Sequence, residues 1–177
     1  EEGYIVTANN GVIGEEYPYH ISNVLAQPYR HDRIVDMITT PMYDEDTGEL
    51  LKLSIGEIRG MQMDKKNLRA EQFLPQLLAI IEAQDTENKY ETIISMLEEW
   101  EYYDDKEQGA PLVFHFLMQT MQETLLQDVM PEDVYELMPG KGQVVDNMLV
   151  TALNGEPGNR VSEAGGLETL VYTSFED

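Results

Sequence analysis

The sequence contains no cysteine, and this absence removes several chemistries at once. Without thiols the chain forms no disulfide, holds no metal through thiolates and offers no cysteine nucleophile. Basic residues are also scarce, since 11 lysines and arginines stand against 34 aspartates and glutamates, for a net charge of −23. A field of that sign repels phosphate groups, which argues against nucleic acid and anionic membrane surfaces as partners. Such acidity is typical of a well-solvated protein surface.

Long hydrophobic runs are missing as well. No stretch approaches the roughly 18 apolar residues of a membrane span, and the first residues lack the basic and apolar regions of a signal peptide. The hydrophobic content of 42% fits an ordinary globular domain. Because an apolar, strand-like run follows the first residues directly, we expect the chain to be an internal piece of a larger protein.

The common catalytic and metal-binding motifs are absent too. His20, His31 and His115 lack the spacing of a metal site such as HExxH, and no GxSxG motif activates a serine. A calcium loop starting at Asp44 would need glycine at position 49 and an acid at position 55, where the chain has glutamate and isoleucine. Acidic residues are so numerous that no pair of them indicates a glycosidase. The residues therefore predict no metal and no cofactor.

Apolar residues recur at three- and four-residue spacing through most of the chain, which predicts a mainly helical fold. Ser54 and Glu57 form a capping box that begins one helix, and Pro111 and Pro131 suit the first turns of two others. Pro75, inside a helical stretch, predicts a kink or a break. The expected helices cover residues 29–38, 54–64, 65–83, 88–100, 112–127, 131–138, 143–153 and 167–175.

The opening run from Gly3 to Gly11 has the composition of a strand that ends on two asparagines. Asn-Gly at positions 10 and 11 is a strong turn signal, because both residue types tolerate positive φ. In a second interpretation, Asn9 presents its side-chain amide as a fixed, neutral donor to the oxyanion of a reacting carbonyl. Arg30 would then hold the amide oxygen with its planar guanidinium. The residues alone leave both interpretations open.

Several segments in a fixed order resemble the penicillin acylase family of N-terminal nucleophile hydrolases. The resemblance lies in Gly3-Tyr4-Ile5-Val6-Thr7-Ala8-Asn9-Asn10, Tyr17-Pro18, Arg30-His31-Asp32-Arg33-Ile34, Leu53-Ser54, Gln62-Met63-Asp64 and Ala70 to Leu74-Pro75. It extends more loosely through Leu97 to Trp100 and the apolar helix at 111–121, while the C-terminal part adds only helical character. The matching stretch is similar to the interior of the larger, β chain of those enzymes.

This resemblance implies a mainly α chain. Residues 29–177 would form a helical insert domain, and residues 1–28 would supply a leading β-strand and a connecting loop from the αββα core of the full enzyme. By the same resemblance, Asn9 joins a backbone N–H from elsewhere to form the oxyanion hole, while Arg30 supports Asn9 and assists maturation. The nucleophile would be the serine that begins the β chain, with its own α-amine as the base.

Two departures from the family pattern matter. Glu1 has no hydroxyl, so we expect this chain alone to lack the nucleophilic serine and to hydrolyse nothing. Relatives bind calcium through an aspartate shortly after the Tyr-Pro step, whereas residues Tyr19 to Ser22 contain no carboxylate. The resemblance therefore leaves calcium open only for the full enzyme, not for this piece.

For the full enzyme, the resemblance implies hydrolysis of N-acyl amide bonds through an acyl-enzyme. The substrate would be a small N-acyl compound of the penicillin, cephalosporin or acyl-homoserine lactone class, and the enzyme would be secreted or periplasmic. Its partners would be the α chain and the rest of the β chain of its own precursor. The alternative is a non-catalytic acidic helical scaffold or protein-interaction domain, in which Asn9-Asn10-Gly11 is a turn and Arg30 a surface charge.

Overall fold

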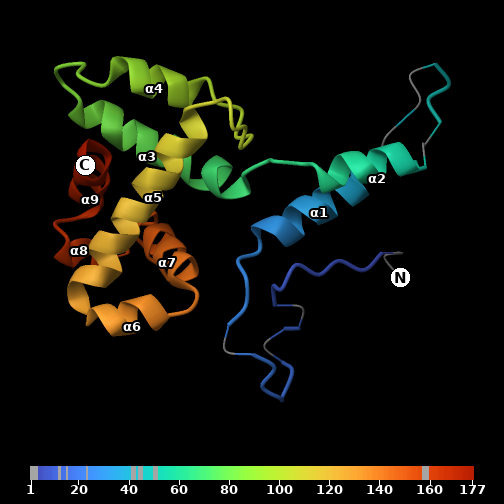
Figure 1. The fold of residues 1–177 in the computed structure, drawn as a ribbon, viewed down its shortest axis with the longest axis horizontal. Helices are drawn as coiled ribbons and strands as arrows, with labels where there is room; N and C mark the ends of the chain where they lie inside the picture. The colour runs from blue at the N-terminus through green and yellow to red at the C-terminus, as the bar shows by residue number, and fades with distance from the viewer. Residues whose placement is uncertain are drawn as a thin grey trace. The chain divides into compact units, whose positions relative to one another are not determined.

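Two compact units make up the chain in the computed structural model, Glu1–Leu68 and Arg69–Asp177, and each is described by itself. The structure describes residues 4–11, 13–14, 16–22, 24–40, 43, 46–49, 52–156 and 160–177. In Figure 1 the first unit runs from blue to green and the second from green to red. The division predicted after residue 28, between hydrolase core and helical insert, stays a prediction.

The first unit begins with a segment that contains no strand. Residues 4–7 carry no strand assignment, and Figure 1 draws the chain before α1 as a coil. The prediction of a leading strand is therefore not realised in this structure. A strand is stabilised by a hydrogen-bonded neighbour, and the described residues of this unit contain no continuous strand to pair with it. Ile5, in the middle of the run, is 96% exposed.

Two helices follow in the first unit, α1 at Tyr29–Thr39 and α2 at Ile55–Gln62. The capping box predicted for α2 is present: Ser54 Oγ accepts from the Glu57 amide at 3.3 Å, and the Glu57 carboxylate accepts from the Ser54 amide. Neither helix has a fully buried side chain. The loop predicted between them is only partly described, and Asp44, where a calcium loop was considered, lies outside the described residues.

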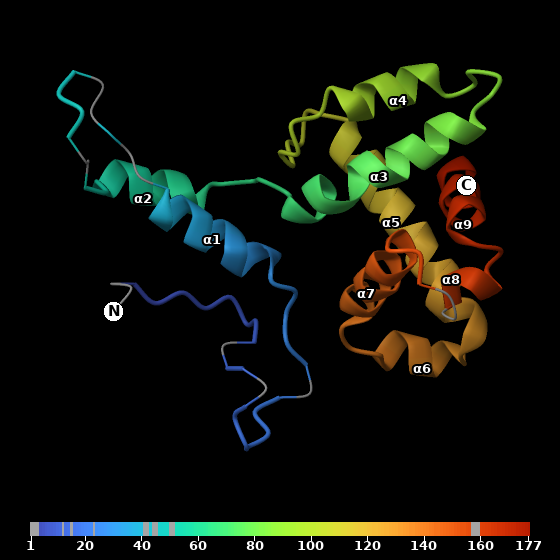
Figure 2. The same ribbon diagram turned by 180° about the vertical axis from the view of Figure 1, so that it is seen from behind.

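The second unit is built from helices around α5, which spans Ala110–Leu126 and packs against α4, α7 and α9. Figures 1 and 2 both show α5 crossing the middle of this unit. None of the helices in the described residues combines the length and the apolar character needed to cross a bilayer. The other elements are α3 (Leu68–Gln84), α4 (Glu91–Glu98), the 3-10 helix η1 (Gln127–Val129), α6 (Glu132–Leu137), α7 (Lys141–Leu153), α8 (Arg160–Glu163) and α9 (Leu167–Glu176).

The core of the second unit follows the predicted apolar spacing. On α5 the buried side chains recur every three or four residues, at Phe114, Met118, Met121 and Leu125. Trp100 packs edge-on against Tyr102 and lies near Phe114, and its indole N–H donates to the Tyr103 carbonyl at 2.9 Å. The neighbouring helices contribute the fully buried side chains Phe73, Leu74, Leu77, Ile81, Leu97, Val145, Leu149 and Leu170.

The helix predictions are confirmed, but several details differ. The helix predicted from residue 65 begins at Leu68, and the one predicted from residue 143 begins at Lys141. The break predicted at Pro75 does not occur, because α3 continues through it and the proline lies on the exposed face. The helix predicted from residue 88 begins only at Glu91, after Asn88 has taken a positive φ of 55°. The short elements η1 and α8 were not predicted, since one turn of helix is too short to show apolar periodicity.

Candidate functional site

Asn9 lies at a sharp bend of the chain that two hydrogen bonds hold. Its backbone has a φ of 64°, the left-handed region that asparagine tolerates better than most residues. The Asn9 carbonyl accepts from the Ala26 amide at 2.7 Å, and the Asn10 carboxamide oxygen accepts from the Ala8 amide at 3.1 Å. The turn predicted at Asn10-Gly11 is thus found one residue earlier, with the positive φ on Asn9 itself.

Arg30, in the first turn of α1, contacts this bend directly. Its Nη2 donates to the side-chain oxygen of Asn9 at 3.0 Å and to the backbone oxygen of Ala8 at 2.9 Å. Although 21 residues separate them in the sequence, the two predicted site residues meet. The structure therefore brings together two residues that the sequence could only suggest as partners.

This contact decides which way the Asn9 amide points. A guanidinium only donates hydrogen bonds, so the atom facing Arg30 must be the carboxamide oxygen. The Nδ2 group is then directed away from Arg30, and it donates to no acceptor in the part of the chain that the structure describes. Asn9 is exposed in this chain, so a ligand can reach the N–H groups. The arrangement holds a neutral donor in a fixed direction, as stabilisation of an oxyanion requires.

A second arginine of α1 ties the same helix to the segment after α2. Arg33 binds Asp64 through two hydrogen bonds of 2.9 Å each, Nε to Oδ2 and Nη2 to Oδ1. These hydrogen bonds from Arg33 hold the pKa of Asp64 below its ordinary value. Arg33 Nη1 also contacts Asp36 at 2.6 Å, one turn along α1. The sequence gives a signal for Arg33, because Arg33 lies three residues from Arg30 and therefore on the same side of a helix.

The histidines and serines form no second site. His31 contacts its neighbour Asp32 at 2.9 Å, and the exposed His115 lies 3.4 Å from Asp104. Within the described ranges no three histidine or acidic side chains converge as metal ligands would. Of the serines, Ser54 caps α2 and Ser22 bonds locally to Val24.

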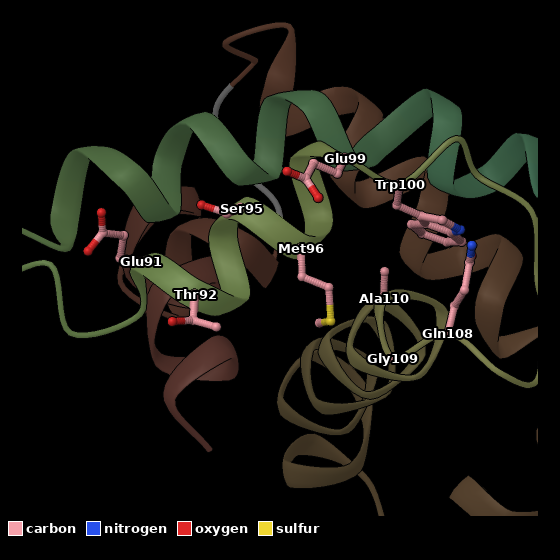
Figure 3. A pocket seen from close by; sticks show the side chains of 9 residues that line it. All are labelled: Glu91, Thr92, Ser95, Met96, Glu99, Trp100, Gln108, Gly109 and Ala110. Carbon is pink, nitrogen blue, oxygen red and sulfur yellow. The ribbon is translucent and has the colours of Figure 1, made fainter.

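An open depression of about 630 Å³ lies in the second unit between α4 and the start of α5. Figure 3 shows the Met96 side chain extending toward the first turn of α5, where Gly109 leaves space for it. A β-carbon added at Gly109 would lie 3.0 Å from the Met96 sulfur, so a larger residue there would require the flexible Met96 side chain to move. The carboxylates that line it, Glu91 at the start of α4 and Glu99 at its C-cap, lie at opposite ends of that helix and so do not form a catalytic pair.

Comparison with known proteins identifies a family for the whole chain. No curated protein matches this chain. The family model described as penicillin amidase matches residues 1–177, the whole of the chain and so both Asn9 and Arg30. This match confirms the resemblance found in the sequence, and the proteins of this family are amidohydrolases. The chain therefore belongs to the penicillin amidase family.

Proposed function

We propose that this chain supplies the oxyanion-stabilising amide of a penicillin amidase-type amidohydrolase, with Asn9 as the donor and Arg30 as the residue that positions it. The observation that supports the proposal is the 3.0 Å contact from Arg30 Nη2 to Asn9 Oδ1. By occupying the oxygen, Arg30 leaves the N–H groups of Asn9 for the negative charge that develops on the substrate carbonyl. Family membership makes that carbonyl the carbonyl of an amide.

The reaction would proceed in two stages. A serine nucleophile, with its own α-amine as the base, attacks the amide carbonyl, and Asn9 donates to the resulting oxyanion. The amine product leaves, and water then releases the acid from the acyl-enzyme through a second oxyanion. We propose that the nucleophile lies outside this chain. Among the described residues of the first unit, the serine other than the helix cap Ser54 is Ser22, and Ser22 bonds to Val24 and not to a base. The chain alone would then be inactive.

Substrate, partners and compartment follow from the family and remain proposals. The substrate would be a small N-acyl compound, with penicillins, cephalosporin side chains and acyl-homoserine lactones as the candidate classes. The partners would be the α chain and the rest of the β chain from the same precursor, and the enzyme would be secreted or periplasmic. A net charge of −23 argues against nucleic acid as a ligand. We propose no cofactor for the reaction, and calcium binding is considered only for the full enzyme.

The proposed role of Asn9 is tested in the complete enzyme with two substitutions. Asn9→Ala removes the donor, and kcat should fall by about 100- to 1,000-fold with little change in KM. Asn9→Asp keeps an oxygen for Arg30 but replaces the N–H groups by negative charge. Its fall in kcat should therefore be at least as large as that of Asn9→Ala. Both are measured as steady-state hydrolysis of an N-acyl chromogenic substrate.

The matched control is Asn10→Ala, which removes the neighbouring carboxamide and its bond to the Ala8 amide. We expect a loss of less than about tenfold, because this amide supports the bend without facing substrate. Full activity of Asn9→Ala would refute the proposed function and favour the alternative of an acidic helical scaffold.

A further inference from the structure

The direction of the Asn9 amide depends on how α1 is oriented, because Arg30 lies in the first turn of that helix. No side chain of α1 is fully buried in this chain, and its apolar side chains such as Ile34 and Ile38 are half-buried, so close packing constrains the rotation of the helix only in part. Directed polar contacts from α1 to other segments therefore contribute to its orientation. Arg30 makes such hydrogen bonds to the bend at Asn9, and Arg33 makes them to Asp64.

The contact between Arg33 and Asp64 is well suited to hold a helix in one orientation. Both oxygens of Asp64 accept from the fork of Arg33, at 2.9 Å each, which fixes direction as well as distance. The Asp64 and Arg33 side chains are 15% and 22% exposed, so water screens this pair less than a surface pair. Asp64 also accepts from the Lys66 backbone amide at 3.3 Å, which holds the carboxylate in place.

The contact of Arg30 is correspondingly sensitive to movement of α1. One nitrogen, Nη2, donates to both the Ala8 and the Asn9 oxygens, so a rotation that lengthens one bond also disturbs the other. Arg30 and Arg33 lie three residues apart on neighbouring turns, so a constraint on one limits the position of the other. A shift of about 1 Å in a group that positions a catalytic donor is enough to lower a rate about 100-fold.

We infer that Asp64 is a positioning residue for amide hydrolysis: through Arg33 it sets the orientation of α1, and through Arg30 the direction of the Asn9 donor. This inference rests on the proposed function of Asn9 and extends it to a residue that touches no substrate. Its signature is a loss of kcat that disappears once the Asn9 amide has been removed.

The test uses Asp64→Asn in the complete enzyme, with Asp36→Asn as its matched control. Both substitutions remove one negative charge beside the same partner, Arg33, but Asp36 lies on α1 itself, and among the described residues its carboxylate contacts only Arg33 and Thr40 at the end of the same helix. We expect Asp64→Asn to lower kcat by about 10- to 100-fold with KM within about twofold of wild type. Asp36→Asn should keep kcat within about twofold, since its contact is an exposed pair inside one helix.

A double substitution separates positioning from general damage. In an Asn9→Ala background the donor is already gone, so adding Asp64→Asn should lower kcat no further. If the two losses multiply instead, or if Asp64→Asn alone leaves kcat unchanged, Asp64 is not a positioning residue, and the role of Asn9 is unaffected. If Asn9→Ala itself leaves kcat unchanged, the proposed function fails, so the two failures are distinguishable.

A second variant, Arg33→Lys, keeps the inference testable if Asp64→Asn does not fold. Should Asp64→Asn fail to give folded enzyme by far-ultraviolet circular dichroism, Arg33→Lys replaces it, because lysine retains the positive charge but lacks the fork. It should show the same selective loss of kcat and the same absence of effect in the Asn9→Ala background. Wild-type kcat in Arg33→Lys would overturn the inference.

Discussion

Asn9 has two hydrogen-bonding ends on its side chain, and Arg30 occupies one of them. This contact uses only the side-chain oxygen of Asn9, so both N–H groups of Nδ2 stay available as donors. Arg30 also keeps a positive charge close to the place where the proposed oxyanion would form. A single arginine therefore contributes both direction and favourable electrostatics at this residue.

The contact between Arg33 and Asp64 also predicts how the stability of the protein depends on pH. Hydrogen bonds from Arg33 hold its pKa below 3.8, so the folded protein binds this proton less readily than the unfolded chain. The stabilisation is then complete above about pH 4 and is lost as the pH falls through the lowered pKa. Wild type should be more stable than Asp64→Asn near neutral pH, and the two should converge as the pH falls through the lowered pKa of Asp64.

Urea unfolding at a series of pH values measures this difference in the free energy of unfolding. A difference that stayed constant from neutral to strongly acid pH would show that the Asp64 carboxylate is not the titrating origin of the stabilisation.

Among the helices, the contact of α3 with α7 contains a largely buried ion pair. Arg69 on α3 donates from Nε and Nη2 to Asp146 Oδ1 on α7, at 2.9 and 2.6 Å, and the Asp146 side chain is only 7% exposed. Arg69→Met would leave this carboxylate without its arginine, so we expect a loss of about 3–5 kcal/mol in the free energy of unfolding. Equilibrium urea denaturation followed by circular dichroism checks the value.

The control for this prediction is Arg160→Met, which breaks an exposed i,i+3 pair with Glu163 on α8. Its cost should stay below about 1 kcal/mol, because exposed pairs are screened by water. Equal losses for the two variants would mean that burial of Asp146 does not set the cost.

The helices show what the sequence alone can predict. The stripe of Phe114, Met118 and Met121 and the capping box of Ser54 are local patterns, so both appear in the structure as expected. The leading strand depends on a partner strand, which no local pattern supplies. Arg30 and Asn9 are 21 residues apart in the sequence, so composition and spacing suggest the residue types but do not predict that the two side chains come into contact. The family resemblance singled out both residues, and the structure adds the hydrogen bond between them and the contact of Arg33 with Asp64.

Across the whole molecule, burial is distributed very unevenly. Of the described residues of the first unit, only Ala8 belongs to the buried hydrophobic set, whereas the second unit contains a full helical core. Several large apolar side chains of the first unit are exposed, including Ile5 at 96% and Ile55 at 89%. Apolar burial is the main source of stability, so the second unit should carry most of it.

Hydrogen exchange tests this distribution on the purified 177-residue chain. We expect slow exchange in α5 and α7 and fast exchange in residues 4–28, because exchange follows the local free energy of opening. Mass spectrometry of peptic peptides after a time course in D₂O gives the comparison. Protection in residues 4–28 equal to that of α5 would contradict the predicted division of stability.

The left-handed backbone at Asn9 has a consequence for how this position can change during evolution. Glycine adopts a φ of 64° without strain but carries no amide, and aspartate accepts the backbone and Arg30 but donates nothing. Glutamine carries the amide but holds it one methylene farther from the backbone, and β-branched residues are strained at this φ. Only asparagine meets both demands. If Asn9 is the oxyanion donor as proposed, glycine or aspartate at this position would mark descendants that kept the fold after losing hydrolase activity.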